Sequence, residues 1–441
     1  MVTRMAATPF PVPPLAQRIF AVARDIGCEA RIVGGAVRDW VLMAENSSPS
    51  EAAGPGRAER ADIDMAIACP IADAMAALRR QRLKIVETGL AHGTITVLDQ
   101  EGVVELTQTR VDLETDGRHA VVGFTDDWAE DARRRDFTVN ALYVTESGHV
   151  EDPLGGLSDL AAGRLRFVGD ARTRIAEDGL RMLRYCRFLP RFGQGGADPE
   201  AVKAIGEMAA QAGNLSGERV ARECRRLFQL PDPLSGAHVL HETGLDQYAL
   251  GVKIQPQALQ HLPPQDVIAS ACAATAETMW LLRMAVCLAD GTAGQLVRRL
   301  RLSRAEGRFL ATVDAASLDR AGYGLTGYGL TGDGLTGDGL AGDGLAGDSW
   351  WRTAWFMRRD GHAPAAIYAV LAARQGHAVS AERMTELANW TPPQCPVTAT
   401  DLLSHGVDKG PVLGDMLDRM ERRWVTHDFT LTKEELLATI T

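Results

Sequence analysis

The 441-residue chain has few cysteines and no arrangement that would join them to one another or to zinc. The seven cysteines form no Cys-X-X-Cys pair and are Cys28, Cys69, Cys186, Cys224, Cys272, Cys287 and Cys395. An odd, scattered set of cysteines argues against a disulfide framework and favours a reducing compartment. We therefore expect a cytoplasmic protein.

Long hydrophobic runs are also missing. No window offers the roughly 18 consecutive apolar residues of a membrane span. The first 25 residues contain prolines and no apolar run long enough for a signal peptide. The net charge of −10 argues against a general nucleic-acid binder but allows a local basic groove. The GxSxG and HExxH signatures are absent. The sequence thus predicts no membrane association, and we infer no obligate protein partner from it.

The most informative segment runs from Arg31 to Asp64. A short apolar run ends at the pair Gly34-Gly35, and a helical pattern begins directly afterwards. Glycines before a helix let backbone N–H groups approach phosphate oxygens closely. Arg38, one turn into that helix, is placed to contact a phosphate with its planar fork.

Two carboxylates, Asp62 and Asp64, alternate with apolar residues on the next predicted strand. Residues two apart on a strand face the same side, so these acids repel each other unless a cation lies between them. Carboxylates suit Mg²⁺, and two ions about 3.5–4 Å apart can hold the attacking and leaving oxygens of phosphoryl transfer. A solvated pair at a strand end is the alternative.

Glu105, on a neighbouring predicted strand, is our candidate for a third catalytic carboxylate. Its alternative is an edge-strand glutamate paired with Arg110. Farther along, Arg134 and Arg135 lead directly into an apolar segment, so we expect them to approach the domain interior and contact phosphate.

A third cluster lies at residues 177–188, in the run EDGLRMLRYCRF. On a helix predicted over 173–190, Asp178, Arg181 and Arg184 would share one face, with Arg187 one turn further on. Such a ladder is either a salt-bridged surface or a device that reads the edge of a nucleotide base. In the second case the carboxylate accepts from the base and a guanidinium donates to it.

Secondary-structure patterns divide the chain into an α/β part and a helical part. Strands and helices alternate to about residue 150, and helical spacing then continues nearly to the end. Residues 322–346 instead repeat a five-residue glycine-rich unit five times. Glycine at that density disfavours a helix, so this segment is either a flexible linker or, less simply, a ligand-binding repeat.

The motifs, taken in order, resemble those of the class II tRNA nucleotidyltransferases and the related bacterial poly(A) polymerases. The matching segments are GGAVRD at 34–39, DID at 62–64, ETDGRHA at 114–120, RRDFTVNAL at 134–142, EDGLRMLRYCRF at 177–188, ERVARE at 218–223 and DLLSHGVDKGPVLGDML at 401–417. The resemblance implies an α+β fold: a polymerase-β-like head with an antiparallel or mixed sheet, followed by an all-helical neck, body and tail. The implied divisions are a flexible tail at 1–12, the head at 13–150, a neck with a base-selecting helix at 151–232, and the body and tail at 233–441 around a linker at 322–348.

The same resemblance implies a template-independent enzyme that adds CCA to the tRNA 3′ end from CTP and ATP. Asp62 and Asp64 would bind Mg²⁺, and the helical body would hold the tRNA acceptor arm. The implied nucleotide-binding residues are Gly34, Gly35, Arg38, Arg134, Arg135, Asp178, Arg181, Arg184 and Arg187. Poly(A) or A-only addition is the alternative, although residues 87–98 lack the arginine-rich stretch of poly(A) enzymes. An inactive RNA-binding protein is a more distant alternative.

Overall fold

The computed structural model describes most of the chain. The described ranges are 9–46, 63–90, 93–115, 120–272, 276–320, 351, 354–355 and 363–440. The predicted repeat linker at 322–348 and Asp62 lie outside them. Two compact units are present: Met1–Leu215 with Glu242–Leu245, and Ser216–His241 with Asp246–Thr441. This division falls well before residue 232, where we placed the end of the neck; the finer four-part division stays a prediction.

The first unit contains a mixed sheet. Within the described residues its strands run in the order β3-β4-β5-β2-β1-β8-β9. Their bounds are β1 (Ala30–Val33), β2 (Ile63–Ile67), β3 (Lys84–Gly89), β4 (Thr94–Asp99), β5 (Gly102–Gln108), β8 (Tyr143–Val144) and β9 (Val150–Glu151). β2 and β5 pair in parallel and the other described neighbours pair antiparallel. The predicted α+β class with a mixed sheet is therefore confirmed. A separate hairpin of β6 (Arg110–Thr115) and β7 (Ala120–Phe124) was not predicted.

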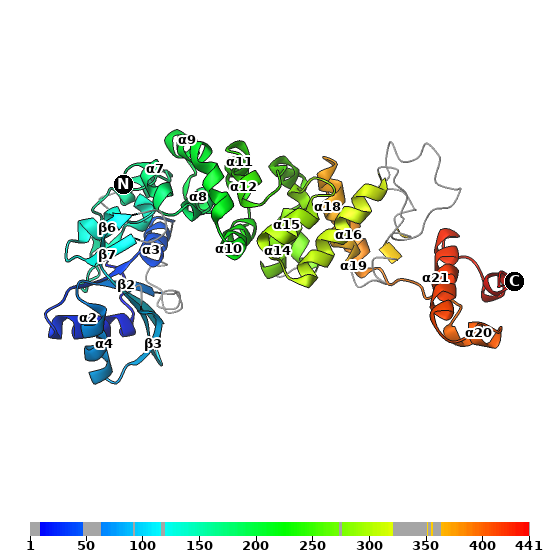
Figure 1. Ribbon diagram of the computed structural model, residues 1–441, viewed down its shortest axis with the longest axis horizontal. Helices are drawn as coiled ribbons and strands as arrows, with labels where there is room; N and C mark the ends of the chain where they lie inside the picture. The colour runs from blue at the N-terminus through cyan, green and yellow to red at the C-terminus, as the bar shows by residue number, and fades with distance from the viewer. Residues whose placement is uncertain are drawn as a thin grey trace. The chain divides into compact units, whose positions relative to one another are not determined.

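The two faces of this sheet have different environments. Helices α2 (Pro14–Asp25) and α4 (Ile71–Arg80) pack together against one face (Figure 1). The strand residues that alternate toward that face, such as Ile32, Met65 and Leu106, are buried. Because strand side chains alternate, the residues between them point to the opposite face. Part of that opposite face is left open, and Asp64 and Glu105 are exposed there.

Helices complete the first unit. They are α3 (Gly35–Asn46), α5 (Trp128–Arg133), η3 (Thr138–Asn140), α6 (Gly156–Ala161), α7 (Ala171–Glu177), α8 (Leu180–Phe192), α9 (Pro199–Met208) and η4 (Ala209–Asn214). The flexible tail predicted over 1–12 is wrong for Phe10, which is buried against Trp40 and donates its N–H to the carbonyl of Gly148 at 2.9 Å. Residues 1–8 lie outside the described part.

The single helix predicted over 173–190 is also wrong, because α7 ends at Glu177 and α8 begins at Leu180. Asp178 between them has an extended backbone, and its carboxylate accepts a hydrogen bond from the Leu180 N–H at 3.0 Å. A short polar side chain that bonds to a nearby backbone amide competes with helix continuation, and here it ends one helix and starts the next.

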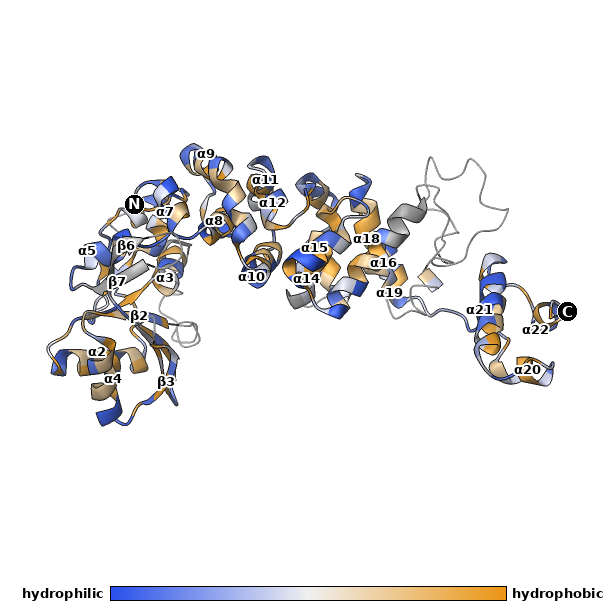
Figure 2. Cartoon of the chain, viewed as in Figure 1, coloured by the Kyte–Doolittle hydropathy of each residue, from blue (hydrophilic) through white to orange (hydrophobic). Residues whose placement is uncertain are grey.

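The regular elements of the second unit are all helices within its described residues, apart from an isolated bridge between Ile254 and Leu288. Its larger helices are α10 (Gly217–Phe228), α11 (Leu234–Glu242), α13 (Gln265–Cys272), α14 (Ala276–Cys287), α15 (Ala293–Leu300), α16 (Arg304–Arg320), α18 (Pro364–Arg374), α19 (Ala381–Asn389) and α21 (Pro411–Thr426). Shorter ones are α12 (Leu245–Ala249), η5 (Pro256–His261), α20 (Ala399–Ser404) and α22 (Lys433–Leu437). α18 is apolar on nearly all sides and is buried from Pro364 to Ala373 (Figure 2).

A separate apolar cluster joins α20, α21 and α22 around Leu402, Trp424 and Leu436. None of the helices in the described ranges combines the length and the apolarity that crossing a bilayer requires.

Candidate active site

The glycine pair forms the turn between β1 and α3. Gly34 has a φ of +76°, a conformation that residues with a side chain rarely adopt. Its N–H donates to the carbonyl of Leu142 at 3.2 Å, which ties the turn to the start of β8. A Cβ placed at Gly34 would lie 3.8 Å from Nη1 of Arg135 and 4.0 Å from Oδ2 of Asp64. The turn therefore lies close to both a guanidinium and a carboxylate.

The structure brings Asp64 and Glu105 together. They are register partners on the parallel strands β2 and β5, so both side chains stand on the same open face. Neighbouring strands are about 4.8 Å apart, which places the two carboxylates side by side. Hard oxygen donors in contact with solvent suit Mg²⁺, which keeps several of its waters and needs only one or two protein carboxylates. The described residues thus fit such an ion; Asp62, the other predicted ligand, lies outside them.

Arg134 and Arg135 share a buried acceptor that we did not predict. Asp131, on α5, is fully buried and accepts from Nε of Arg134 at 2.9 Å and from Nη2 of Arg135 at 3.0 Å. The Tyr143 hydroxyl also donates to Asp131, at 2.9 Å. Burial alone would raise the pKa of the Asp131 carboxyl, but Arg135 and Arg134 beside it lower that pKa below its usual value. Asp131 is therefore ionised at neutral pH.

Arg38 occupies a more enclosed position than its predicted phosphate role suggests. Its guanidinium is buried, donates to Oδ1 of Asn140, and forms an ion pair with Asp39 at 2.8 Å. It also lies 4.1 Å from the centre of the Phe192 ring. Burial lowers the pKa of Arg38, but an arginine stays charged. These contacts favour a bracing role, and direct contact with nucleotide stays a prediction.

A buried polar chain continues from Asn140 to helix α8. Asn140 donates through Nδ2 to Asp136 at 2.9 Å, and Asp136 accepts from Nε of Arg184 at 2.7 Å. Burial opposes ionisation of Asp136, but Arg184 and Asn140 more than offset that effect, so the Asp136 pKa lies below its usual value. The chain Arg38–Asn140–Asp136–Arg184 connects the helix after the glycine turn to α8.

The remaining predicted nucleotide residues lie at the start of α8 and along it. Arg181 donates to the carbonyls of Arg174 at 2.8 Å and Arg134 at 3.0 Å, and it pairs with Glu177. Arg187 lies 3.9 Å from the centre of the Phe188 ring. Asp178 precedes the helix, so the expected ladder of Asp178, Arg181 and Arg184 on one helical face is wrong as geometry. The base-reading roles are untested by these contacts.

Two functional partners escaped the sequence argument for different reasons. Asp131 stands three and four residues before Arg134 and Arg135, a spacing that predicts ion pairs on a helix. The sequence therefore carries a local signal for Asp131. Tyr143 gives no such signal, because it lies eight residues after Arg135, outside α5, and no helical or strand period relates the two positions.

The comparisons with known proteins agree with this geometry. A family described as "Poly A polymerase head domain" matches residues 30–166, and "Probable RNA and SrmB- binding site of polymerase A" matches residues 197–252. The first match covers the glycine turn, both described carboxylates and the Asp131–Arg135 segment. The head is thus of the polymerase nucleotidyltransferase class.

Full-length relatives narrow the class. The chain is 30% identical over 418 residues to "CCA tRNA nucleotidyltransferase 1, mitochondrial" of Danio rerio, covering 93% of this chain and 87% of the relative. The human protein of that name is 29% identical, with 93% and 86% covered. The chain belongs to the CCA tRNA nucleotidyltransferase family. This finding confirms the predicted resemblance and the predicted enzyme class.

Solved structures confirm the fold. The Bacillus stearothermophilus CCA-adding enzyme in complex with CTP superposes with a TM-score of 0.63 at 24% identity, covering 96% of this chain and 95% of that one. The Thermotoga maritima CCA-adding enzyme complexed with tRNA gives 0.63 at 17% identity, covering 99% and 97%. At these identities the likeness establishes the architecture.

The prediction of a cytoplasmic protein is wrong on this comparison, because relatives from mouse, zebrafish and human all carry "mitochondrial" in their names. The physical reason is that free cysteines distinguish reducing from oxidising surroundings and do not tell one reducing compartment from another. All seven cysteines are free thiols in the structure.

Proposed function

We propose that the chain adds C, C and A to the 3′ end of tRNA from CTP and ATP, without a nucleic-acid template. The observation that carries this proposal is the pairing of Asp64 with Glu105 on the open face of the sheet, beside Gly34 and Arg135. Family membership supports the reaction class, and the geometry supports the place where it occurs.

The residues around the glycine turn would hold the triphosphate. Gly35 opens the 12-residue helix α3, whose N-terminal amides and dipole favour an anion. Arg135 offers a guanidinium whose Nη1 faces the turn. Because positioning and charge neutralisation supply most of the catalysis in phosphoryl transfer, this cradle would orient the α-phosphate for in-line attack.

Magnesium is the cofactor that these acids would hold. Asp64 and Glu105, with Asp62, supply the hard oxygen donors that it prefers. When bound, the ion stabilises the charge that develops on the phosphoryl oxygens and lowers the pKa of the attacking tRNA hydroxyl. The residues themselves set the direction of approach, since both described carboxylates stand on one face.

Selection of cytosine and adenine would fall to Asp178 and Arg181, with Arg184 and Arg187 toward ribose or phosphate. Arg181 already donates to the backbone at Arg134, so the residue proposed to read the base is joined to the segment proposed to hold phosphate. This connection supports a coupling between base recognition and phosphate alignment.

The second unit carries a surface suited to the tRNA backbone. Exposed arginines of α10 and the α15 region are Arg219, Arg222, Arg226, Arg298 and Arg301. Two of these arginines form ion pairs, Arg301 with Glu218 at 2.7 Å and Arg226 with Glu223 at 3.9 Å. Arginines that neutralise phosphates make binding salt-dependent, by roughly one unit of log–log slope per contact. We therefore expect Arg222→Ala to weaken tRNA binding and reduce the salt slope by about 1.

Poly(A) or A-only addition is the second candidate, because the head matches a family named for poly(A) polymerase. A product-length assay separates the candidates. A tRNA that lacks its terminal CCA is incubated with CTP, with ATP, and with both. Extension by two residues with CTP alone and three with both supports CCA addition. Growth with ATP alone on that substrate supports poly(A) addition, and no extension under any condition overturns both CCA addition and poly(A) addition.

A further inference from the structure

Tyr143 stands in the same transverse row of the sheet as the two carboxylates. Its register partner on β1 is Val33, whose partner on β2 is Asp64, whose partner on β5 is Glu105. Register partners point to the same face, and each step across the sheet is about 4.8 Å. The Tyr143 ring is thus on the face that carries Asp64, two strands away from it.

The Tyr143 hydroxyl joins two charged groups. It accepts a hydrogen bond from Nε of Arg135 at 3.0 Å and donates its own to Oδ2 of Asp131 at 2.9 Å. Burial raises the Tyr143 pKa, so the hydroxyl keeps the proton that it donates. Asp131 in turn accepts from Nη2 of Arg135. Two nitrogens of the Arg135 fork are therefore held by Tyr143 and Asp131, while the third, Nη1, lies 3.8 Å from the position of a Cβ at Gly34.

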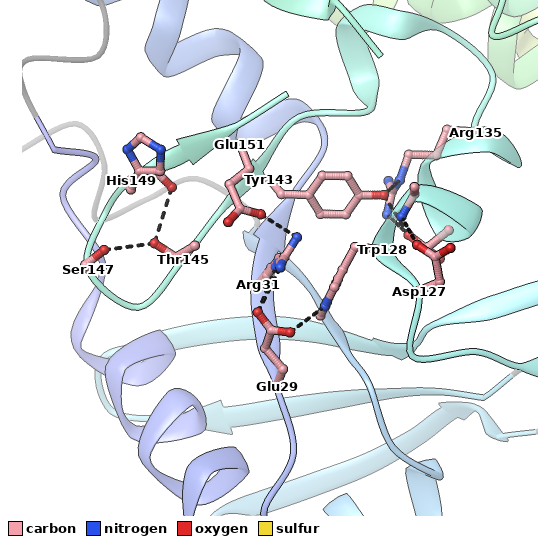
Figure 3. Close-up of polar contacts among 12 residues, drawn as sticks. Glu29, Arg31, Asp127, Trp128, Arg135, Tyr143, Thr145, Ser147, His149 and Glu151 are labelled. Carbon is pink, nitrogen blue, oxygen red and sulfur yellow. Dashed lines mark hydrogen bonds and ion pairs between the residues drawn. The ribbon is translucent and has the colours of Figure 1, made fainter. Parts of the chain in front are cut away.

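Neighbouring side chains hold the Tyr143 ring in place. The Trp128 ring meets the Tyr143 ring edge-on at 5.6 Å, and its Nε1 donates to Glu29 at 2.8 Å. Arg31 lies 4.2 Å from the centre of the Trp128 ring and pairs with Glu29 (Figure 3). The tyrosine therefore has little freedom to rotate away from Arg135.

We propose that Tyr143 and Asp131 are positioning residues that aim the Arg135 guanidinium at the triphosphate of the incoming nucleotide. The inference rests on the proposed function and goes beyond it by naming the groups that set nucleotide affinity without touching the nucleotide. The arrangement has the form expected for this task, because a guanidinium held at two nitrogens loses little freedom when the third binds phosphate.

The test is a double-mutant cycle of Tyr143→Phe and Arg135→Ala, with steady-state kinetics for CTP, ATP and tRNA. Tyr143→Phe keeps the ring and removes only the hydroxyl. We expect the KM for CTP and for ATP to rise about tenfold, the equivalent of about 1.4 kcal/mol, while the KM for tRNA is unchanged. In the Arg135→Ala background, the same tyrosine change should have no further effect, because its target is gone.

Tyr185→Phe is the matched control. Tyr185 is also a buried tyrosine of the first unit, and its hydroxyl accepts a hydrogen bond from the Asp198 N–H at 2.8 Å, away from Arg135. Its loss should lower the melting temperature about as much as Tyr143→Phe does and leave the KM for nucleotide unchanged.

The outcomes separate the two proposals. If Arg135→Ala leaves nucleotide KM unchanged, the phosphate role of Arg135 in the proposed function fails, and the positioning pair with it. If Arg135→Ala raises KM but Tyr143→Phe does not, the positioning inference alone is overturned. Additive effects in the double variant would also overturn it, since they would make the hydroxyl a general structural contact.

Discussion

The open face of the sheet and helix α8 carry charge in opposite ways. Asp64 and Glu105 are exposed to solvent and stand side by side as register partners on two parallel strands. On α8, Arg181 and Arg184 are held by backbone carbonyls, Glu177 and the buried Asp136. Like charges brought together at a surface indicate a ligand, whereas opposite charges paired under cover indicate a brace. The paired carboxylates of the open face therefore serve function at a cost in stability. The ion pairs of α8 contribute to both function and stability.

The largest expected effect comes from the open face. We expect Asp64→Asn to lower the rate of nucleotide transfer by about 10³-fold, because it removes electrostatic stabilisation of the reacting phosphate. The melting temperature should stay within about 2 °C of the wild type, because Asp64 is exposed and the change removes the repulsion between its carboxylate and that of Glu105. Rates and thermal unfolding are measured on the same preparation. Glu87→Gln, on the exposed edge strand β3, is the control and should retain activity.

If Asp64→Asn keeps its activity, or if that variant unfolds, Asp64 does not act mainly in function as proposed.

Glu105→Gln tests the second carboxylate of the open face, because Glu105 is the register partner of Asp64. A loss of about 10²-fold is expected if it acts as the third carboxylate. Activity equal to that of wild type would reduce Glu105 to a surface residue.

Removing the brace should act first on stability. Arg184→Met leaves Asp136 buried without its cation, and we expect the free energy of unfolding to fall by about 3 kcal/mol. Chemical denaturation measures this change. If Arg184→Met and the wild type have the same free energy of unfolding, the buried chain from Arg38 to Arg184 is not a brace.

The same pair gives a pH dependence with a definite sign. The folded-state pKa of Asp136 lies below its ordinary value. Its contribution to stability is therefore complete above the unfolded pKa of about 3.9 and disappears as the pH falls through the lower folded value. The stability difference between wild type and Arg184→Met should shrink below about pH 4. A difference that grows in acid would reverse the assignment.

Substitution of Arg181 tests whether helix α8 only braces the fold or also takes part in nucleotide selection. If it only braces, Arg181→Ala lowers stability and leaves selectivity intact. We expect instead that discrimination of CTP and ATP against UTP and GTP falls about tenfold, the value of one good hydrogen bond to a base. Competition assays with mixed nucleotides measure the ratio, and Arg172→Ala, whose partner Glu207 is exposed, serves as the control.

The smallest effect is expected outside both regions. Deleting residues 322–346 should change the rate of transfer by less than about twofold, because a glycine-rich linker contributes mainly through its length. These residues lie outside the described part of the structure, so the expectation rests on the sequence. A collapse of activity would assign the repeat a specific role.

The sequence predicted the open face better than the brace, for a physical reason. Asp64 and Glu105 follow from strand alternation, which is local, and their adjacency needs only the pairing of β2 with β5. Besides its near partners, Arg181 contacts the carbonyl of Arg134, and Arg184 pairs with Asp136; each of these two contacts spans nearly fifty positions. No local period reports such a contact, and the break of the helix at Asp178 depended on one side-chain cap.

The most direct test of the central claim is a crystal of this protein soaked with Mn²⁺, as a stand-in for Mg²⁺, and CTP. We predict an anomalous peak between the Asp64 carboxylate and the triphosphate, on the open face of the sheet, with Arg135 contacting a phosphate oxygen. An ion and nucleotide bound away from Asp64 and Glu105 would contradict the account.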